Sequence, residues 1–170
     1  MEKPSIIIGS DHGGFELKKA VVCHLDSCGY EVEDIGCYST ESVDYPDYAN
    51  VVASAVVSGK QEKGILCCTT GIGMASAANR FPGVQAAVVT DVELAAETRV
   101  HNDTNVICLA GSSNTPEEIS AIVDAWLDAD FEDGGRHGRR VGKMNTCATA
   151  VSAPKLAVTC LLYTSRAHET

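Results

Sequence analysis

The sequence lacks the features that nucleic-acid and membrane proteins require. Among its 170 residues, 13 Lys and Arg stand against 23 Asp and Glu, and the net charge of −10 argues against broad nucleic-acid binding, which needs a basic face. No apolar run reaches the length of a membrane span. We expect no secretion signal before the apolar segment that begins at Ile6. We therefore expect a cytoplasmic protein that binds neither nucleic acid nor membrane.

The sequence also lacks the usual motifs for metals and cofactors. Its eight cysteines include no C-x₂-C pair, so zinc-type spacing is absent, and free thiols in a reducing compartment are the better interpretation. The Lys-Ser/Thr of a phosphate-binding P-loop is missing, and Ser76 stands where a dinucleotide fingerprint has its third glycine. We predict no metal and no cofactor.

What the sequence does contain is a regular alternation of strand-like and helix-like segments. Strands are expected at residues 5–10, 31–35, 64–68, 84–89 and 106–109. Between them apolar residues recur at helical spacing, and the helix after Thr115 has a capping-box pattern. The alternation predicts an α/β fold: a Rossmann-like five-stranded parallel sheet with helices on both faces, in a single domain. This domain is expected to cover residues 1–144, and the tail, 145–170, has no clear period and no assigned role.

The stretch 64–79 organises the rest of the chain. An apolar strand runs into a polar loop, and the loop opens a helix of small residues. Gly71 and Gly73 allow the backbone N–H groups of that loop to approach a ligand closely. Cys68 lies where the strand ends, a position that lowers the pKa of a thiol and favours the thiolate. The stretch is typical of an anion cradle with a base or nucleophile at its edge, although a cysteine at a strand end is often only a small buried residue.

Two polar residues follow the first strand. Asp11 and His12 would lie at the carboxyl end of that strand, where open α/β sheets bind ligands. Asp11 could equally serve as the N-cap of the next helix. His12 has less structural reason to be there, because it stands in a Gly-rich turn.

Two further polar groups occur late in the chain. His101 and Asn102 belong to a polar cluster just before the fifth strand, which could also be a solvated turn. Arg136 and Arg140 belong to a basic cluster and are four residues apart, so on a helix both would point the same way and could hold a phosphate. A solvated charged surface is the alternative.

Five segments together resemble a known family. They are Ser10–Phe15, Asp44–Asp47, Cys68–Gly73, His101–Asp103 and Gly135–His137. These segments are similar to the motifs of type B ribose-5-phosphate isomerases, in a wider family that includes galactose-6-phosphate isomerase subunits. The likeness spans roughly residues 5–143, in the same order and spacing.

The resemblance implies a metal-independent isomerase that interconverts an aldose phosphate and its ketose. It implies that Cys68 is the base that moves a proton between neighbouring carbons and that His101 assists ring opening. It also implies a homodimer whose active sites are shared by the two subunits. The residues it assigns to substrate binding are Asp11, His12, Tyr45, Thr69, Thr70, Gly71, Ile72, Gly73, Asn102, Arg136 and Arg140.

Two departures from the family pattern leave the substrate open. Thr69 stands where the family usually has Gly, and Ser112 stands where it commonly has a phosphate-binding Arg. The preferred sugar could have four, five or six carbons, and a family member without catalysis that acts as a regulatory partner stays an alternative. A nucleotide-binding Rossmann domain is the other alternative, and it would use Asp34 as its ribose anchor.

Overall fold

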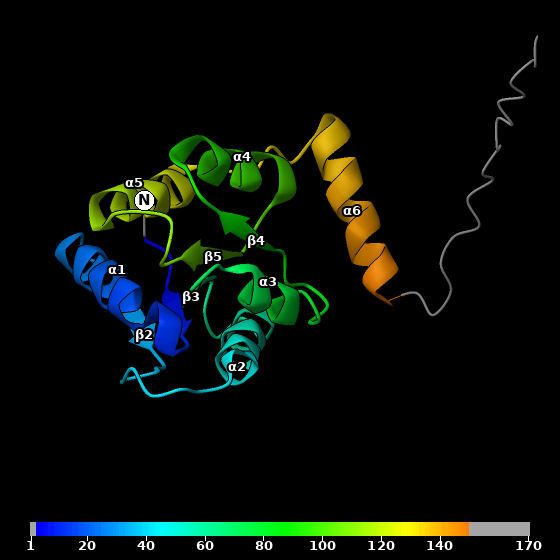
Figure 1. The fold of residues 1–170 in the computed structure, drawn as a ribbon. Helices are drawn as coiled ribbons and strands as arrows, with labels where there is room; N and C mark the ends of the chain where they lie inside the picture. The colour runs from blue at the N-terminus through cyan, green and yellow to red at the C-terminus, as the bar shows by residue number, and fades with distance from the viewer. Residues whose placement is uncertain (1–2, 150–170) are drawn as a thin grey trace, which may run out of the picture.

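The computed structural model describes residues 3–149, and strands alternate with helices along that part of the chain (Figure 1). The strands are β1 (Ile6–Ser10), β2 (Val32–Asp34), β3 (Lys63–Cys68), β4 (Ala86–Val89) and β5 (Val106–Ala110). The helices are the short 3₁₀ helix η1 (His12–Gly14), α1 (Phe15–Ser27), α2 (Tyr45–Val57), α3 (Ile72–Ala78), α4 (Val92–Asn102), α5 (Pro116–Asp128) and α6 (Gly135–Thr149). Within the described residues, no helix is long and apolar enough to cross a membrane.

The five strands form one parallel sheet in the order β2-β1-β3-β5-β4, which confirms the predicted fold class. The chain moves outward from β1 to β2 and then returns to place β3 on the other side of β1. The carboxyl ends of β1 and β3 therefore flank the point at which the strand order reverses. In open α/β sheets this switch point is where ligands bind.

Helices cover both faces of the sheet and bury two separate apolar layers. One layer joins the sheet to α1, α4 and α5, and the other joins it to α2 and α3 (Figure 1). Because side chains alternate along a strand, Cys67 packs in the first layer and Cys68 in the second. These two neighbours therefore face opposite sides of the sheet.

The ends of the helices follow from local capping. The capping box of Thr115 and Glu118 is present at the start of α5, and the Asp91 side chain accepts a hydrogen bond from Leu94 N at the start of α4. The far end of α4 includes part of the polar cluster that precedes the fifth strand. The helix continues through Asn102, so His101 and Asn102 belong to its last turn rather than to a free loop.

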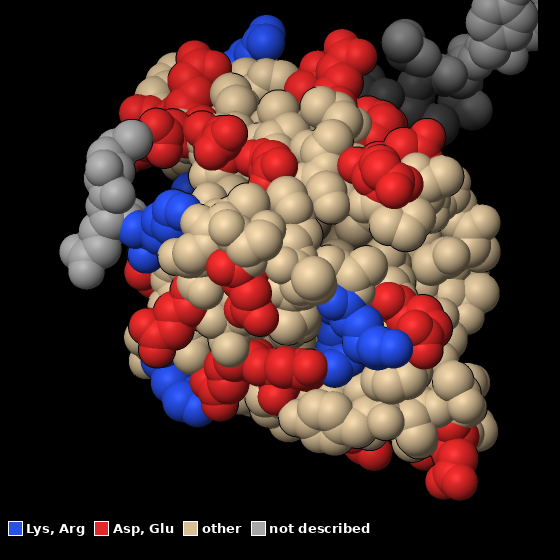
Figure 2. Space-filling view, turned by 90° about the vertical axis from the view of Figure 1, so that its left-hand side faces the viewer, with Lys and Arg blue, Asp and Glu red and all other residues tan. Residues whose placement is uncertain are grey.

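Helix α6 lies to one side of the sheet and contacts α4 (Figure 1). It continues past residue 144 to Thr149, so the expected domain boundary falls within a helix, and residues 150–170 lie outside the described part of the chain. Figure 2 shows the side of the molecule on which α1 lies, where Asp and Glu are spread more widely than Lys and Arg.

Candidate active site

The loop after β1 is packed tightly against the end of β3. The Asp11 carboxylate is buried and accepts a hydrogen bond from Gly14 N at 3.0 Å, so Asp11 does act as an N-cap. A Cβ atom on Gly14 would lie 2.3 Å from the carbonyl oxygen of Cys67, and only glycine fits there. The Nδ1 atom of His12 accepts a hydrogen bond from Val43 N at 3.2 Å. In neutral His12 the proton is therefore on Nε2, which is the nitrogen that can donate to a ligand.

Cys68 ends β3 at the same edge of the sheet. The residue is buried, and its Sγ atom accepts a hydrogen bond from the backbone N–H of Gly71 at 3.0 Å. Gly71 adopts a left-handed conformation with φ of 75°, which turns this N–H back towards the sulfur. A hydrogen bond to an ionised acceptor is stronger than one to its neutral form. The loop thus directs a backbone hydrogen-bond donor at the Cys68 sulfur.

The residues between Cys68 and α3 border the same site. Thr69, Thr70 and Ile72 are exposed, and Ile72 keeps 63% of its surface accessible although it is apolar. Tyr45, the first residue of α2, lies against Gly73, where an added Cβ would be 3.0 Å from the Tyr45 ring. The structure thus gathers part of the predicted substrate-binding set around Cys68 at the carboxyl edge of the sheet. The residues gathered there are Asp11, His12, Tyr45 and Thr69–Gly73.

The remaining predicted residues form a second group. The His101 ring stacks on the buried His137 ring, with centroids 4.2 Å apart and planes inclined by 7°. Arg136 Nε donates a hydrogen bond to His137 Nε2 at 3.0 Å, so that nitrogen carries no proton. The carboxylate of Glu132 lies 3.9 Å from the same nitrogen, too far for a hydrogen bond, and we assign no ion pair there. Arg136 and Arg140 are both exposed on α6.

The two groups lie at opposite edges of the sheet. Cys68 is level with Ala110 at the end of β5, whereas α4 ends at Asn102, before β5 begins at Val106. Four residues of strand separate these levels, which is about 13 Å at 3.3 Å per residue. One chain therefore does not bring His101 to Cys68, and the single site expected for them is not formed within one subunit.

A cavity of about 570 Å³ lies beside the second group. Asn102, Arg80, Phe81 and Met144 are among the residues that line it, and neither Cys68 nor His101 does so. The cavity is therefore a hollow next to α6 and is separate from the Cys68 site at the end of β3.

Comparison with known proteins gives the family. The family model described as Ribose/Galactose Isomerase matches residues 6–144. The chain belongs to the ribose/galactose isomerase family. Ribose-5-phosphate isomerase B of Escherichia coli (strain K12) is 48% identical over 136 residues, which cover 80% of this chain and 91% of the relative.

Solved structures of ribose-5-phosphate isomerase B agree with the fold. The enzyme from Clostridium thermocellum superposes with a TM-score of 0.83 at 46% identity, covering 85% of this chain and 97% of its own. The Mycoplasma genitalium enzyme, solved with bound ribulose 5-phosphate, has a TM-score of 0.81 at 42% identity and covers 85% and 96%. The family inferred from the five sequence motifs is confirmed.

Membership of the ribose/galactose isomerase family also weighs against the nucleotide-binding alternative. That alternative needed Asp34 to be free for a ribose, but the Asp34 carboxylate pairs with the buried Lys18 ammonium at 2.5 Å and accepts from Gly36 N at 2.9 Å. The carboxylate is thus held by its own chain.

One residue of the second group was missed from the sequence. His137 lies in the Gly135–His137 motif, yet it was not included among the predicted site residues. Its burial and its stacking on His101 come from the packing of α6 against the end of α4, which no sequence spacing indicates. The usable signal was the adjacency of His137 to Arg136 within one motif.

Proposed function

We propose that this chain is an aldose–ketose isomerase of a sugar phosphate, most suited to ribose 5-phosphate and ribulose 5-phosphate. The observation that carries the proposal is the Cys68 thiol, at the switch point of the sheet, with the Gly71 N–H directed at its sulfur. The relatives named ribose-5-phosphate isomerase B, one of them with ribulose 5-phosphate bound, support the five-carbon substrate. We place the protein in the cytoplasm.

In the proposed reaction Cys68 acts as the base. The thiolate removes the proton from C2 of the open-chain aldose, and the electron pair left behind forms an enediolate with negative charge on the C1 oxygen. Backbone N–H groups between Thr69 and Gly73 are placed to stabilise that charge. The proton then returns from sulfur to C1 while the C2 hydroxyl proton moves to the C1 oxygen, which yields the ketose. The thiolate is regenerated, and no metal or cofactor takes part.

The other roles follow from the two edges of the sheet. We assign ring opening to His101, sugar hydroxyls to Asn102, and the phosphate to His12, Arg136 and Arg140. Since one chain holds Cys68 and His101 at opposite edges, we propose a homodimer in which each site takes one edge from each subunit. Asp11 and Tyr45 complete the wall around the sugar on the Cys68 side.

The two departures from the family pattern touch each other in the fold. The Ser112 hydroxyl donates a hydrogen bond to the carbonyl oxygen of Thr69 at 2.7 Å. The Thr69 hydroxyl in turn lies against Gly13, 2.3 Å from where a Cβ would be. The Thr69 side chain thus occupies space next to the loop that carries Gly13. The phosphate contact that an Arg at position 112 would offer is absent. We infer that this pair affects substrate affinity or sugar length rather than the proton transfer.

The test is an isomerase assay of the purified protein on aldose and ketose phosphates of four to six carbons. We expect turnover of ribose 5-phosphate, with inorganic phosphate as a competitive inhibitor. Turnover confined to a four- or six-carbon sugar would change the substrate but keep the reaction. No turnover on any member of the panel, in protein that melts cooperatively, would favour a family member without catalysis.

The phosphate assignment has a matched control on α6. Arg140→Ala is expected to weaken sugar-phosphate binding by about 1.5–3 kcal/mol, the range for hydrogen bonds to charged groups. Arg139→Ala removes the same charge from the adjacent exposed position and should leave binding unchanged. Equal binding by both variants would show that Arg140 is a solvated surface residue with no role in phosphate binding.

A further inference from the structure

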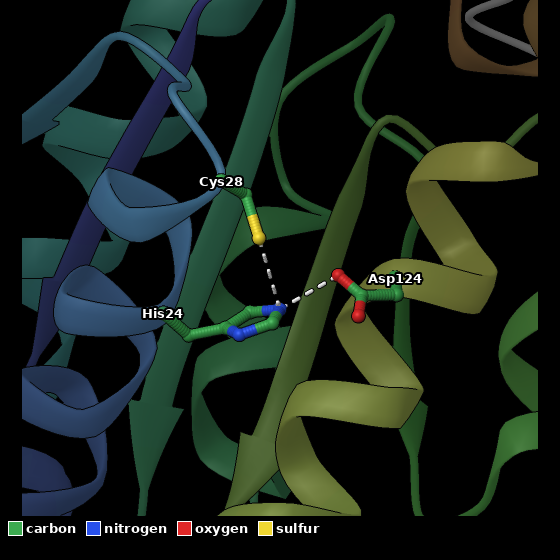
Figure 3. A group of neighbouring side chains, drawn as sticks. All are labelled: His24, Cys28 and Asp124. Atoms are coloured by element: carbon green, nitrogen blue, oxygen red, sulfur yellow. Dashed lines mark hydrogen bonds and ion pairs between the residues drawn. The ribbon is translucent and has the colours of Figure 1, made fainter.

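A second cluster of reactive side chains lies away from the candidate active site. His24 is on the last turn of α1, Cys28 is the residue that caps the end of that helix, and Asp124 is on α5, which packs beside α1 (Figure 3). The His24 Nε2 atom is 2.7 Å from Asp124 Oδ1 and 3.9 Å from Cys28 Sγ. All three side chains point to one spot between the helices, and their ligand atoms lie within 4.8 Å of one another.

The three atoms have the chemistry of a zinc site, and the distances from the nitrogen to the other two lie near the spacing that zinc requires. Imidazole nitrogen, thiolate sulfur and carboxylate oxygen are the ligands that zinc uses in proteins, and bonds of 2.0–2.3 Å in a tetrahedron place ligand atoms about 3.3–3.8 Å apart. The nitrogen–sulfur distance fits this range after a shift of a few tenths of an ångström. The nitrogen–oxygen distance must widen by about half an ångström, which small rotations of the side chains supply.

Burial and charge around the cluster are also suitable for a cation. His24 keeps 19% of its side-chain surface exposed and Asp124 keeps 46%, so an ion could enter and retain a water molecule. Figure 2 shows acidic side chains spread over this side of the molecule. Lys3 brings an opposing charge near the cluster, because its ammonium lies over the Tyr30 ring and donates a hydrogen bond to the Cys28 carbonyl.

We propose that His24, Cys28 and Asp124 bind a zinc-like divalent cation, with water in the fourth position. Because α1 runs antiparallel to the strands, its last turn lies at the amino edge of the sheet, opposite Cys68. The ion would therefore fasten α1 to α5 and stabilise the fold instead of taking part in the isomerisation. Its binding displaces the proton shared by His24 and Asp124 and the proton of the Cys28 thiol.

Spacing along the sequence gives little sign of this site. His24 and Cys28 are four residues apart on a helix, which places them on one face. The third ligand comes from 100 residues later in the chain. The packing of α1 against α5 brings the three side chains together.

The proposal is tested with Co²⁺ as a spectroscopic substitute for zinc, using the full chain without a histidine tag after removal of metals with a chelator. We expect one equivalent of Co²⁺ to give a thiolate-to-cobalt charge-transfer band and the visible bands of a tetrahedral site, and Zn²⁺ to displace it. Cys28→Ser should abolish the charge-transfer band, and His24→Gln should abolish stoichiometric binding. Cys23→Ser, which changes an exposed thiol in the same helix, should keep both.

The outcomes separate this site from the other thiols. Circular dichroism checks that each variant is folded, and Zn²⁺ should raise the melting temperature of the parent and of Cys23→Ser but not of Cys28→Ser. The proposal is overturned if no cobalt band appears at saturation. It is equally overturned if the band survives Cys28→Ser and disappears in Cys68→Ser, which would place the ion at the candidate active site.

Discussion

Cys67 and Cys68 are adjacent residues with different surroundings. Cys67 is fully buried in the layer beneath α1 and α5, and this burial raises the pKa of its thiol well above the usual range. Cys68 meets the N–H of Gly71 at the edge of the sheet. Neighbouring thiols in one strand thus have separate uses, the first in packing and the second in the proposed chemistry.

This difference predicts distinct effects of the same substitution. Cys68→Ser replaces the proposed base with an alcohol that is seldom ionised at neutral pH, and turnover should fall by about 10²–10⁴-fold, the usual contribution of a general base. Substrate binding should persist, because other residues make the phosphate and hydroxyl contacts. Cys67→Ser is the control and should lower the melting temperature while keeping most turnover. Near-normal turnover in folded Cys68→Ser protein would reject the thiolate mechanism.

Lys63 gives a prediction on pH and stability. Burial, with a smaller contribution from Arg99, lowers the pKa of Lys63 to about 8, against about 10.4 in an unfolded chain. Below pH 8 the ammonium is charged in both states, and folding costs its desolvation. Between about pH 8 and 10.4 the folded state has released the proton while the unfolded state retains it, so this group makes stability rise with pH.

Removing the Lys63 charge should therefore stabilise the protein at neutral pH. We expect Lys63→Met to increase the free energy of unfolding by about 1 kcal/mol near pH 7, a figure reduced for partial exposure and for the lost contact with the Trp126 ring. The gain should shrink as the pH rises above 8. Urea unfolding at several pH values measures it, with the exposed Lys60→Met as control. A gain that is constant across the pH range would assign it to packing instead.

At the scale of elements, the η1 loop depends on two glycines with different neighbours. A Cβ on Gly13 would meet the side chain of Thr69, whereas a Cβ on Gly14 would meet the backbone of Cys67 and Cys68. The Thr69 side chain can rotate away from an added Cβ, but the backbone of β3 cannot move without breaking its hydrogen bonds in the sheet. We expect Gly13→Ala to cost about 1 kcal/mol of unfolding free energy and Gly14→Ala about 3 kcal/mol or more.

A double-mutant cycle with Thr69→Gly checks this explanation. Removing the Thr69 side chain should cancel most of the cost of Gly13→Ala and none of the cost of Gly14→Ala, because only the first clash involves that side chain. Denaturant unfolding of the single and double variants gives the coupling free energy. Additive costs for Gly13→Ala and Thr69→Gly would show that the two residues do not constrain each other.

The elements also show how far the sequence predicts this fold. The strands were located within one or two residues and the α5 cap was found, because burial and capping leave local patterns. The last turn of α4 was missed because Asp103, a residue with a side chain, ends the helix with φ of 53°, where glycine would have been a clearer signal. Strand order and the His101–His137 stack could not be predicted, since both depend on contacts between distant segments.

At the scale of the whole molecule, the site residues divide between the two edges of the sheet. Helices in a parallel α/β fold run against their strands, so a loop after a strand and the end of a helix lie at opposite edges. Residues that act together can then be supplied from both edges only if a second subunit is present. This geometry is the physical argument for a two-fold dimer with shared sites.

The proposed dimer predicts that two inactive variants restore each other. Cys68→Ala and His101→Ala should each be inactive alone. In a mixed dimer, one site receives both substitutions while the other receives the intact Cys68 and the intact His101. Random exchange makes half of the dimers mixed, so the mixture should recover about a quarter of parent activity.

Subunit exchange must be demonstrated for this test, for example by native mass spectrometry of two chains of different mass. A mixture of Cys68→Ala with Cys68→Ser is the control, because no pairing of those chains restores a thiol at position 68. If each site were formed within one chain, every subunit in the mixed dimer would carry one damaged site. Activity would then stay at the low level of the two single variants. A proven mixed dimer without activity would therefore exclude shared sites while leaving the isomerase proposal intact.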